Sequence, residues 1–395
     1  MTIRPPLRFV CLSVVLLLIT SGVALAQHGP VTGGGMIGGS TERSSKPATK
    51  PANKPASTTT PRKRPTPAPV RRPTSSTVSA DAYYQQGEAL YNAKKYREAL
   101  ELYLKATEIN PSMSSALYRI GWIYNDLGEY ESAVDPIKRV VAVQPTYAAA
   151  HFELAYAYKK LERYNEALTS FQQTVRLKPD YASAHYELGW IHNEQKNYNA
   201  AILSLNSALS YRSDYADAQN ERGYAFRYLN RNAEAIQAYR EAVRLNPQFG
   251  LAYMGLGDVY YYNTKQYAEA ANAYKQGLQY RPNNVTALYN LGWCYNDMER
   301  YADAVTELRK AVALQPSYPE AYNEIGYALH QLGRFAEAVQ QYQIAIRQKT
   351  NYASAHFNLG MSFLALNNRN AALQQYRILQ GIDAARATKL FNHIK

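Results

Sequence analysis

Three tryptophans stand in almost the same local sequence, which makes them the first candidates for a binding chemistry. Each follows a glycine and precedes an asparagine by three residues, in the segments Gly121–Asp126, Gly189–Glu194 and Gly292–Asp297. Aromatic rings beside amide and carboxylate groups can pack on an extended or helical peptide and form hydrogen bonds with its backbone. The same rings can stack on sugar rings. The residue types therefore predict recognition of a polymer rather than catalysis.

Further aromatic residues recur at related positions. The position of the tryptophans is filled in other parts of the chain by Tyr156, Tyr224 and Tyr327, and the position four residues earlier by Tyr118, Phe152, Tyr186 and Tyr289. The asparagines that follow the tryptophans share a helical face with them, because residues three apart are neighbours on a helix. The pattern predicts a ladder of aromatic side chains edged with polar groups. The alternatives are that these rings only fill space between helices, or that they are partly packed and partly exposed.

Other site chemistries lack their residues. No two histidines stand three or four apart and the cysteines do not cluster, so we expect no metal site. There is no phosphate loop, no G-x-S-x-G motif and no separate domain for catalysis, so we expect neither an enzyme nor a cofactor. His151, His185 and His356 share a position held elsewhere by tyrosine or leucine, which predicts packing roles. Cys294 is expected to be a buried thiol.

The elements that position these residues repeat every 34 residues. Four positions of the repeat hold the same kind of residue in successive units, and we call each such set of equivalent positions a column. They are a glycine or alanine such as Gly121, an alanine such as Ala133, a large residue such as Ile137, and a closing proline. The proline column holds Pro111, Pro145, Pro179, Pro247, Pro282 and Pro316. In each unit, apolar residues recur at helical spacing in two runs, which predicts a helix pair. The small residues are expected to mark the crossing of the two helices, and proline ends the second helix.

One unit differs from the others in length. The step from Pro247 to Pro282 is 35 residues, and the extra residue falls within Tyr260–Tyr267. We interpret it as a longer turn between the two helices of that unit.

These linked columns resemble the tetratricopeptide repeat family, and the resemblance covers the chain after Ala80. It implies an all-α solenoid, a right-handed superhelix of about nine helix-turn-helix repeats over residues 81–380, since one helix pair cannot cover both of its apolar faces. A capping helix is expected in residues 381–395, with Ala384, Ala387, Phe391 and Ile394 facing inward. The implied function is that of a non-catalytic binding scaffold.

The resemblance also implies where a partner binds, because the ladder positions correspond to those that line the concave groove of such proteins. The lysines of the family's dicarboxylate clamp are missing, which disfavours an acidic C-terminal tail as ligand. The predicted partner-binding groove comprises Tyr118, Trp122, Asn125, Phe152, Tyr156, Tyr186, Trp190, Asn193, Tyr224, Tyr289, Trp293, Asn296 and Tyr327.

The N-terminus predicts export. Arg4 and Arg8 precede a short apolar run, and Ala24-Leu25-Ala26 offers small residues for cleavage, so residues 1–26 are expected to be a signal peptide. No later stretch approaches the length of a transmembrane helix. Only Cys294 remains after cleavage, which excludes an intramolecular disulfide. The predicted location is extracytoplasmic, either periplasmic or secreted, in a bacterial envelope.

Residues 27–80 are rich in glycine, then in proline, threonine, serine and basic residues, and are predicted to be a disordered linker. Nine Lys/Arg against one Glu give this segment +8 of the total +13, which with +2 in the signal peptide leaves +3 for the repeats. The segment is either a solvated spacer or a contact for acidic envelope polymers. Export and the nearly neutral repeats argue against nucleic acid.

The expected function is to hold a protein or peptide partner of unknown identity in an envelope assembly. A glycan- or peptidoglycan-binding protein that uses the same aromatic ladder and the basic segment is the alternative. A subunit of an enzyme system whose catalytic part lies on another chain is a third possibility.

Overall fold

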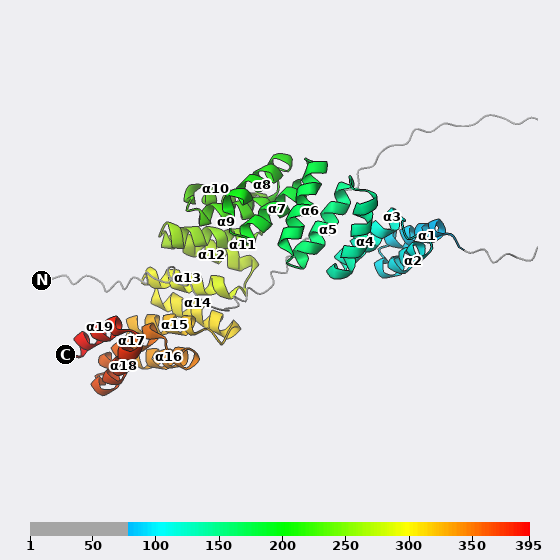
Figure 1. The fold of residues 1–395 in the computed structure, drawn as a ribbon. Helices are drawn as coiled ribbons and strands as arrows, with labels where there is room; N and C mark the ends of the chain where they lie inside the picture. Colours follow the sequence, from blue (N-terminus) through cyan, green and yellow to red (C-terminus); the bar gives the residue numbers. More distant parts are fainter. Residues whose placement is uncertain (1–77) are drawn as a thin grey trace, which may run out of the picture. The chain divides into compact units, whose positions relative to one another are not determined.

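A computed structural model describes residues 78–395, and this part of the chain is helical throughout, as predicted (Figure 1). Its helices form nine antiparallel pairs followed by α19 (Ala384–Ile394). The first helices of the pairs are α1 (Ala80–Asn92), α3 (Ser114–Asp126), α5 (Ala148–Lys160), α7 (Ala182–Glu194), α9 (Ala216–Tyr228), α11 (Gly250–Asp258), α13 (Val285–Asp297), α15 (Pro319–Gln331) and α17 (Ala353–Ala365). The second helices are α2 (Tyr96–Ile109), α4 (Tyr130–Val143), α6 (Tyr164–Leu177), α8 (Tyr198–Tyr211), α10 (Asn232–Leu245), α12 (Tyr267–Tyr280), α14 (Tyr301–Leu314), α16 (Phe335–Gln348) and α18 (Arg369–Ile382).

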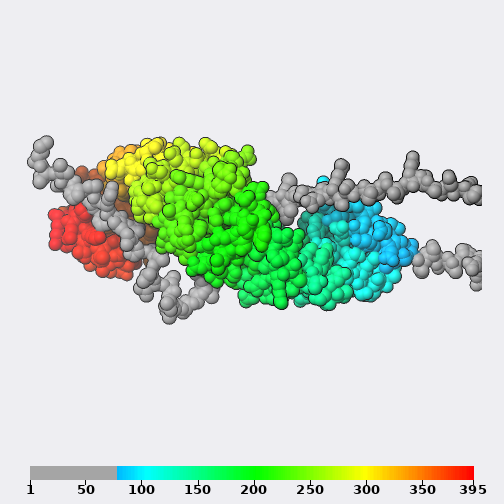
Figure 2. All heavy atoms as spheres, turned by 90° about the horizontal axis from the view of Figure 1, so that it is seen from above, coloured from blue at the N-terminus to red at the C-terminus, as the bar shows by residue number. Residues whose placement is uncertain are grey.

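The helices stack in the order of the sequence, so each pair packs against the pairs before and after it (Figures 1 and 2). First helices of neighbouring pairs also contact one another, as α3 does with α5, α7 with α9 and α13 with α15. Neighbouring second helices make no comparable contacts. The spacing between pairs is therefore tighter on the side of the first helices, and these helices line the inner side of the stack.

The two helices of a pair cross where the sequence has small residues. A Cβ added to Gly121 would lie 2.2 Å from Cγ1 of Ile137, and one added to Gly326 would lie 2.6 Å from Cε1 of Tyr342. Every residue of the alanine column, Ala133 among them, is fully buried. The small columns thus mark the crossing, as expected, because only they let a large residue of the second helix reach the backbone of the first.

Each helix pair is joined by a tight turn that contains one residue with positive φ. Two of these residues are Gly128 and Gly333, with φ of 78° and 74°. The other seven are not glycine, although the left-handed region costs most residues about 1–2 kcal/mol. They are Lys94, Glu162, Lys196, Asn230, Lys265, Glu299 and Asn367. The position repeats with the same period as the other columns, but its varied residue types hide it in the sequence.

The longer unit does not have a longer turn, so that prediction was wrong. Its turn, residues 264–266, is as long as the turn at residues 93–95 of the first unit. The extra residue lies instead in the first helix, where α11 continues into a π-helical turn, η1 (Val259–Asn263). A π turn holds one more residue than an α turn, so the helix ends at the usual place and the following turn keeps its geometry.

The C-terminal helix α19 covers the last pair. Ala387, Leu390 and Ile394 are buried there, at the three- and four-residue spacing of an inward face. Ala384 was expected to face inward but is exposed, because it is the first residue of the helix, directly after the N-cap Asp383. Leu390 takes its place and packs against Gly360. Within residues 78–395, no helix is both long enough and apolar enough to cross a bilayer.

Candidate functional site

The three tryptophans are half-buried, and each packs against the preceding helix pair. The ring of Trp122 lies 5.3 Å from that of Tyr91, the ring of Trp190 lies 6.1 Å from that of Tyr164, and the ring of Trp293 lies 5.4 Å from that of Tyr261. One part of each indole therefore joins two repeats while another part stays accessible. This is the mixed arrangement among the alternatives considered.

The remaining predicted aromatic residues are half-buried on the same helices. Those four residues before the tryptophan position each meet a tyrosine that directly precedes the next first helix. The pairs are Tyr118 with Tyr147, Phe152 with Tyr181, Tyr186 with Tyr215 and Tyr289 with Tyr318, at 4.9–5.1 Å between ring centres. These partner tyrosines form a column that the sequence analysis missed. We call the surface made by the aromatic residues and the polar side chains beside them on the first helices the first-helix face.

The asparagines have a different place from the predicted one. Asn125, Asn193 and Asn296 are buried, at 6%, 2% and 5% exposure, instead of edging a groove. The amide Nδ2 of Asn193 donates to the main-chain oxygen and to Oε2 of Glu221, both at 3.0 Å. The other two form the same pair of bonds with Glu153 and Glu324. In each case the glutamate lies 28 residues later on the next first helix, which is close enough for a short side chain to reach.

These Asn–Glu links leave polar atoms without partners. Oδ1 of all three asparagines is buried and accepts no hydrogen bond within the described part of the chain. Burial raises the pKa of Glu153, Glu221 and Glu324 to about 7, because desolvation disfavours the charged carboxylate. None of the three forms an ion pair with a residue in the described range. The links thus contain acceptors in excess of donors.

At one interface, lysine replaces the asparagine. Lys159 occupies the equivalent position between α5 and α7, and its Nζ lies 2.5 Å from Oε2 of Glu187. The same Nζ lies 3.9 Å from the ring centre of Trp190. An ammonium group is therefore held between a carboxylate and an indole, an arrangement that combines an ion pair with a cation–π contact.

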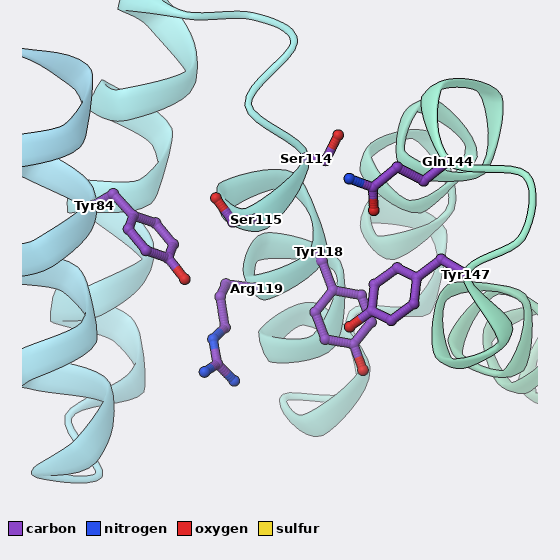
Figure 3. A pocket seen from close by; sticks show the side chains of 7 residues that line it. All are labelled: Tyr84, Ser114, Ser115, Tyr118, Arg119, Gln144 and Tyr147. Carbon is purple, nitrogen blue, oxygen red and sulfur yellow. The ribbon is translucent and has the colours of Figure 1, made fainter.

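Two hollows open on the first-helix face. The larger, about 340 Å³, lies between α1, α3 and the segment before α5 (Figure 3). It is lined by Tyr84, Ser114, Ser115, Tyr118, Arg119, Gln144 and Tyr147. Arg119 is held by two bonds to Glu88, at 2.8 and 2.9 Å, so its charge is already neutralised. A partner side chain entering this hollow would meet phenol rings and hydroxyl groups.

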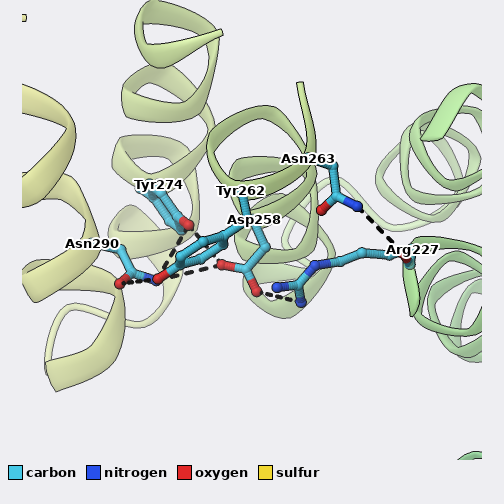
Figure 4. Close-up of polar contacts among 6 residues, drawn as sticks. All are labelled: Arg227, Asp258, Tyr262, Asn263, Tyr274 and Asn290. Atoms are coloured by element: carbon cyan, nitrogen blue, oxygen red, sulfur yellow. Dashed lines mark hydrogen bonds and ion pairs between the residues drawn. The ribbon is translucent and has the colours of Figure 1, made fainter. Parts of the chain in front are cut away.

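The second hollow, about 260 Å³, lies where the ladder is interrupted. Asp258 stands there in place of an aromatic ring and accepts from Arg227 at 2.8 Å and from the hydroxyl of Tyr274 at 2.6 Å (Figure 4). Gly255 stands where four other units have glutamate, and a Cβ at this position would lie 2.4 Å from a ring atom of Tyr239.

The hydroxyl of Tyr262, on η1, donates to Oδ1 of Asn290 at 3.1 Å. This bond fixes the side chain of Asn290, which lines the second hollow. The amide of Asn290 in turn points to Asp258 (Figure 4). The sequence analysis did not single out this cluster, although the replacement of an aromatic residue by Asp258 at the ladder position was a usable signal.

Charge is distributed unevenly between the two sets of helices. The first helices, with η1, carry 12 Asp and Glu against five Lys and Arg, a net −7, although the repeats as a whole are positive. On the second helices, carboxylates such as Glu166, Glu241 and Glu337 are paired with a cation three residues away. The first-helix face is therefore the acidic side of the repeats.

The histidines and the cysteine behave as expected for packing residues. In His151, His185 and His356, Nε2 contacts a main-chain oxygen six residues earlier, at 2.8–2.9 Å. Cys294 is fully buried, and burial raises the pKa of its thiol. No group of metal-ligating side chains occurs within residues 78–395.

Comparisons with known protein families find matches to repeat models along most of the described residues. Tetratricopeptide repeat models match residues 80–113, 114–147 and 152–220, and a TPR repeat model matches 223–263, 261–295, 294–333 and 326–367. Tetratricopeptide repeat protein 6 of Homo sapiens is 29% identical over 63 residues, which is 16% of this chain and 12% of the relative. The match therefore spans a small part of that relative's length.

Among solved structures, YrrB, a TPR protein with an unusual peptide-binding site, matches with a TM-score of 0.45 and 24% identity. The match covers 48% of this chain and 97% of that one. PilW, a widely conserved type IV pilus biogenesis factor, matches with a TM-score of 0.46 and 20% identity, over 53% and 98% of the two chains. The repeated sequence positions, the helix pairs and the matches to family models together show that the chain belongs to the tetratricopeptide repeat family.

Proposed function

We propose that this protein is a non-catalytic scaffold that holds a peptide or protein partner against its first-helix face. The observation that carries the proposal is the row of half-buried aromatic residues along successive first helices, next to two hollows of side-chain size. Half-exposed aromatic rings offer apolar contact area at little entropic cost, and they dominate the energetics of protein interfaces. The rings are already fixed by the neighbouring repeat, so binding would not have to order them.

We place this activity outside the cytoplasm, in the cell envelope. This part of the proposal depends on the predicted signal peptide in residues 1–26 and on the basic segment 27–80, which lie outside the described residues except for residues 78–80. The segment 27–80, at +8, is proposed as a tether or as a contact for acidic polymers. The first-helix face has the opposite charge. It therefore favours a protein partner over anionic wall polymers, which its carboxylates would repel.

Site-specific photo-crosslinking tests the proposal. A photoreactive phenylalanine analogue in place of Tyr156 or Tyr224, on the first-helix face, should capture the same partner in the native envelope. The control is the same analogue in place of Tyr280, an exposed residue at the end of the second helix α12. Adducts that are equal at Tyr280 and at Tyr156 would contradict a specific role for this face.

Truncation of the tryptophans provides a second readout. We expect Trp122→Ala and Trp190→Ala to remain folded and to lose the crosslinked partner, because a half-exposed ring contributes more to an interface than to the core. If both variants unfold, the indoles serve packing alone and the proposal loses its support. If they fold and bind purified wall glycan less well than the native chain, the glycan-binding alternative holds instead.

A further inference from the structure

The chain's own Lys159 shows how the first-helix face holds a cation. Its ammonium group lies between Glu187 and the ring of Trp190, which is three residues further along the same helix. The side chains of Lys159 and Glu187 are each only 12% exposed, so the pair is largely shielded from water. A cation on this face is therefore stabilised by a carboxylate and an aromatic ring together.

The same pair of a glutamate and an aromatic residue three positions later occurs at three other interfaces. The pairs are Glu153 with Tyr156, Glu221 with Tyr224, and Glu324 with Tyr327, and all six residues are half-buried. At these interfaces the preceding repeat supplies an asparagine instead of a lysine. The carboxylate and the ring are in place, and no cationic side chain within residues 78–395 forms an ion pair with any of these three glutamates.

The hydrogen bonds to the glutamates at these three positions all come from neutral amide groups. Glu221 and Glu324 each accept from two asparagine amides, one on either carboxylate oxygen, and Glu153 accepts from one, but none of the three forms an ion pair within the described residues. The asparagines of the Asn–Glu links are more than nine-tenths buried, and their Oδ1 atoms accept nothing. A ligand that brings acceptors would add to the excess, whereas a ligand that brings a positively charged N–H donor would correct it.

We propose that the first-helix face recognises a basic peptide segment, whose lysine or arginine side chains bind at Glu153/Tyr156, Glu221/Tyr224 and Glu324/Tyr327 as Lys159 binds at Glu187/Trp190. The inference rests on the proposed function and adds the chemistry of the partner. The net charge of −7 on the first helices agrees with it. One position is less open than the others, because Lys160 already lies 5.3 Å from the ring centre of Tyr156.

Binding of a capped peptide of alternating lysine and glycine to the full chain tests the proposal by calorimetry. We expect Glu221→Gln and Glu324→Gln each to weaken binding about fivefold or more, because each removes the charge that faces a ligand cation. A matched control is Glu187→Gln, which changes the charge of the face by the same amount. Its position is already filled by Lys159, so it should bind the peptide nearly as well as the native chain.

A gain of binding complements these losses. Lys159→Gln should strengthen binding of the lysine peptide severalfold, because it opens the position between Glu187 and Trp190. Two results would overturn the assignment. The first is an equal loss of peptide affinity in Glu187→Gln and Glu221→Gln, which would indicate an effect of the overall charge of the face. The second is that a peptide with glutamate in place of lysine binds the native chain as tightly as the lysine peptide. Neither result would alter the photo-crosslinking at Tyr156, so the proposed function is tested separately.

Discussion

At the scale of single residues, the asparagines were predicted to lie on a binding surface, but they form contacts between neighbouring first helices. Asn193 shares a helical face with Trp190, which favours a role beside it in ligand binding. Its partner Glu221 lies 28 residues away, and nothing in the local sequence indicates that the two side chains meet. The position of Asn193 follows from the close approach of neighbouring first helices, which only the stacked repeats create.

The Asn–Glu link makes a prediction at this scale. Asn193→Ala should lower the free energy of unfolding by about 1–3 kcal/mol, because two buried acceptors of Glu221 lose their donor. The midpoint of urea unfolding measures the change. Asn199→Ala, at an exposed position of the adjacent second helix, serves as control and should be nearly neutral. A midpoint for Asn193→Ala that equals that of the control would mean that the link contributes nothing to stability.

At the scale of the elements, each helix pair depends on a turn whose geometry is the same in every unit while its sequence varies. Seven of the nine turns accept the strain of a residue such as Glu162 or Lys196 in the left-handed region. The helix boundaries could be predicted from apolar spacing and proline. The turn residue could not, because lysine, glutamate and asparagine are also common on helix surfaces.

Gly333 isolates the contribution of this turn. A Cβ added there would meet no atom within 4 Å, so Gly333→Ala changes little besides the backbone preference at φ of 74°. We expect it to cost about 1 kcal/mol or more of unfolding free energy. Gly381→Ala is the matched control, since its Cβ also meets nothing but the residue lies in α18. It should be neutral or stabilise by up to about 1 kcal/mol, since alanine favours a helix.

At the scale of the whole molecule, the Asn–Glu links couple stability to pH at three separate interfaces. Burial raises the pKa of Glu153, Glu221 and Glu324 from 4.5 to about 7. A raised carboxyl pKa means that the folded chain binds the proton more tightly than the unfolded chain. The stability that these groups contribute is therefore complete below about pH 4.5, falls as the pH rises through about 7, and is lost above that.

The triple variant Glu153→Gln/Glu221→Gln/Glu324→Gln tests this coupling. Between about pH 5 and pH 8, the native chain should lose more of its thermal stability than the variant, because glutamine keeps the neutral form at every pH. The exposed carboxylates that are paired with arginine, such as Glu166 and Glu337, have a lowered pKa and titrate below this window. Parallel melting curves for the two proteins across the window would show that the three glutamates are not the cause.

Most of the architecture could be predicted from the sequence, because a 34-residue period repeats the same packing problem nine times. The half-buried state of Trp122 and Trp190 was also among the alternatives that the sequence allowed. The π turn at Val259–Asn263 could not be distinguished from a longer loop, since one extra residue fits either. The acidic character of the first helices was present in the sequence, but it emerges only when charges are counted by helix instead of by segment.

The interruption at the sixth unit has a consequence for how a long partner can bind. A face built from nine identical units would let an extended ligand shift by one unit at little cost, so that many alignments would compete. Here the pair of glutamate and aromatic residue occurs in only four of the nine units, and Gly255 and Asp258 stand in its place in the sixth. The π turn adds Tyr262 beside them, and Lys159 fills the position at Glu187. These departures break the translational symmetry of the face. A partner that matches them would be held in a single alignment, and one that is shifted by a repeat would meet the wrong charge.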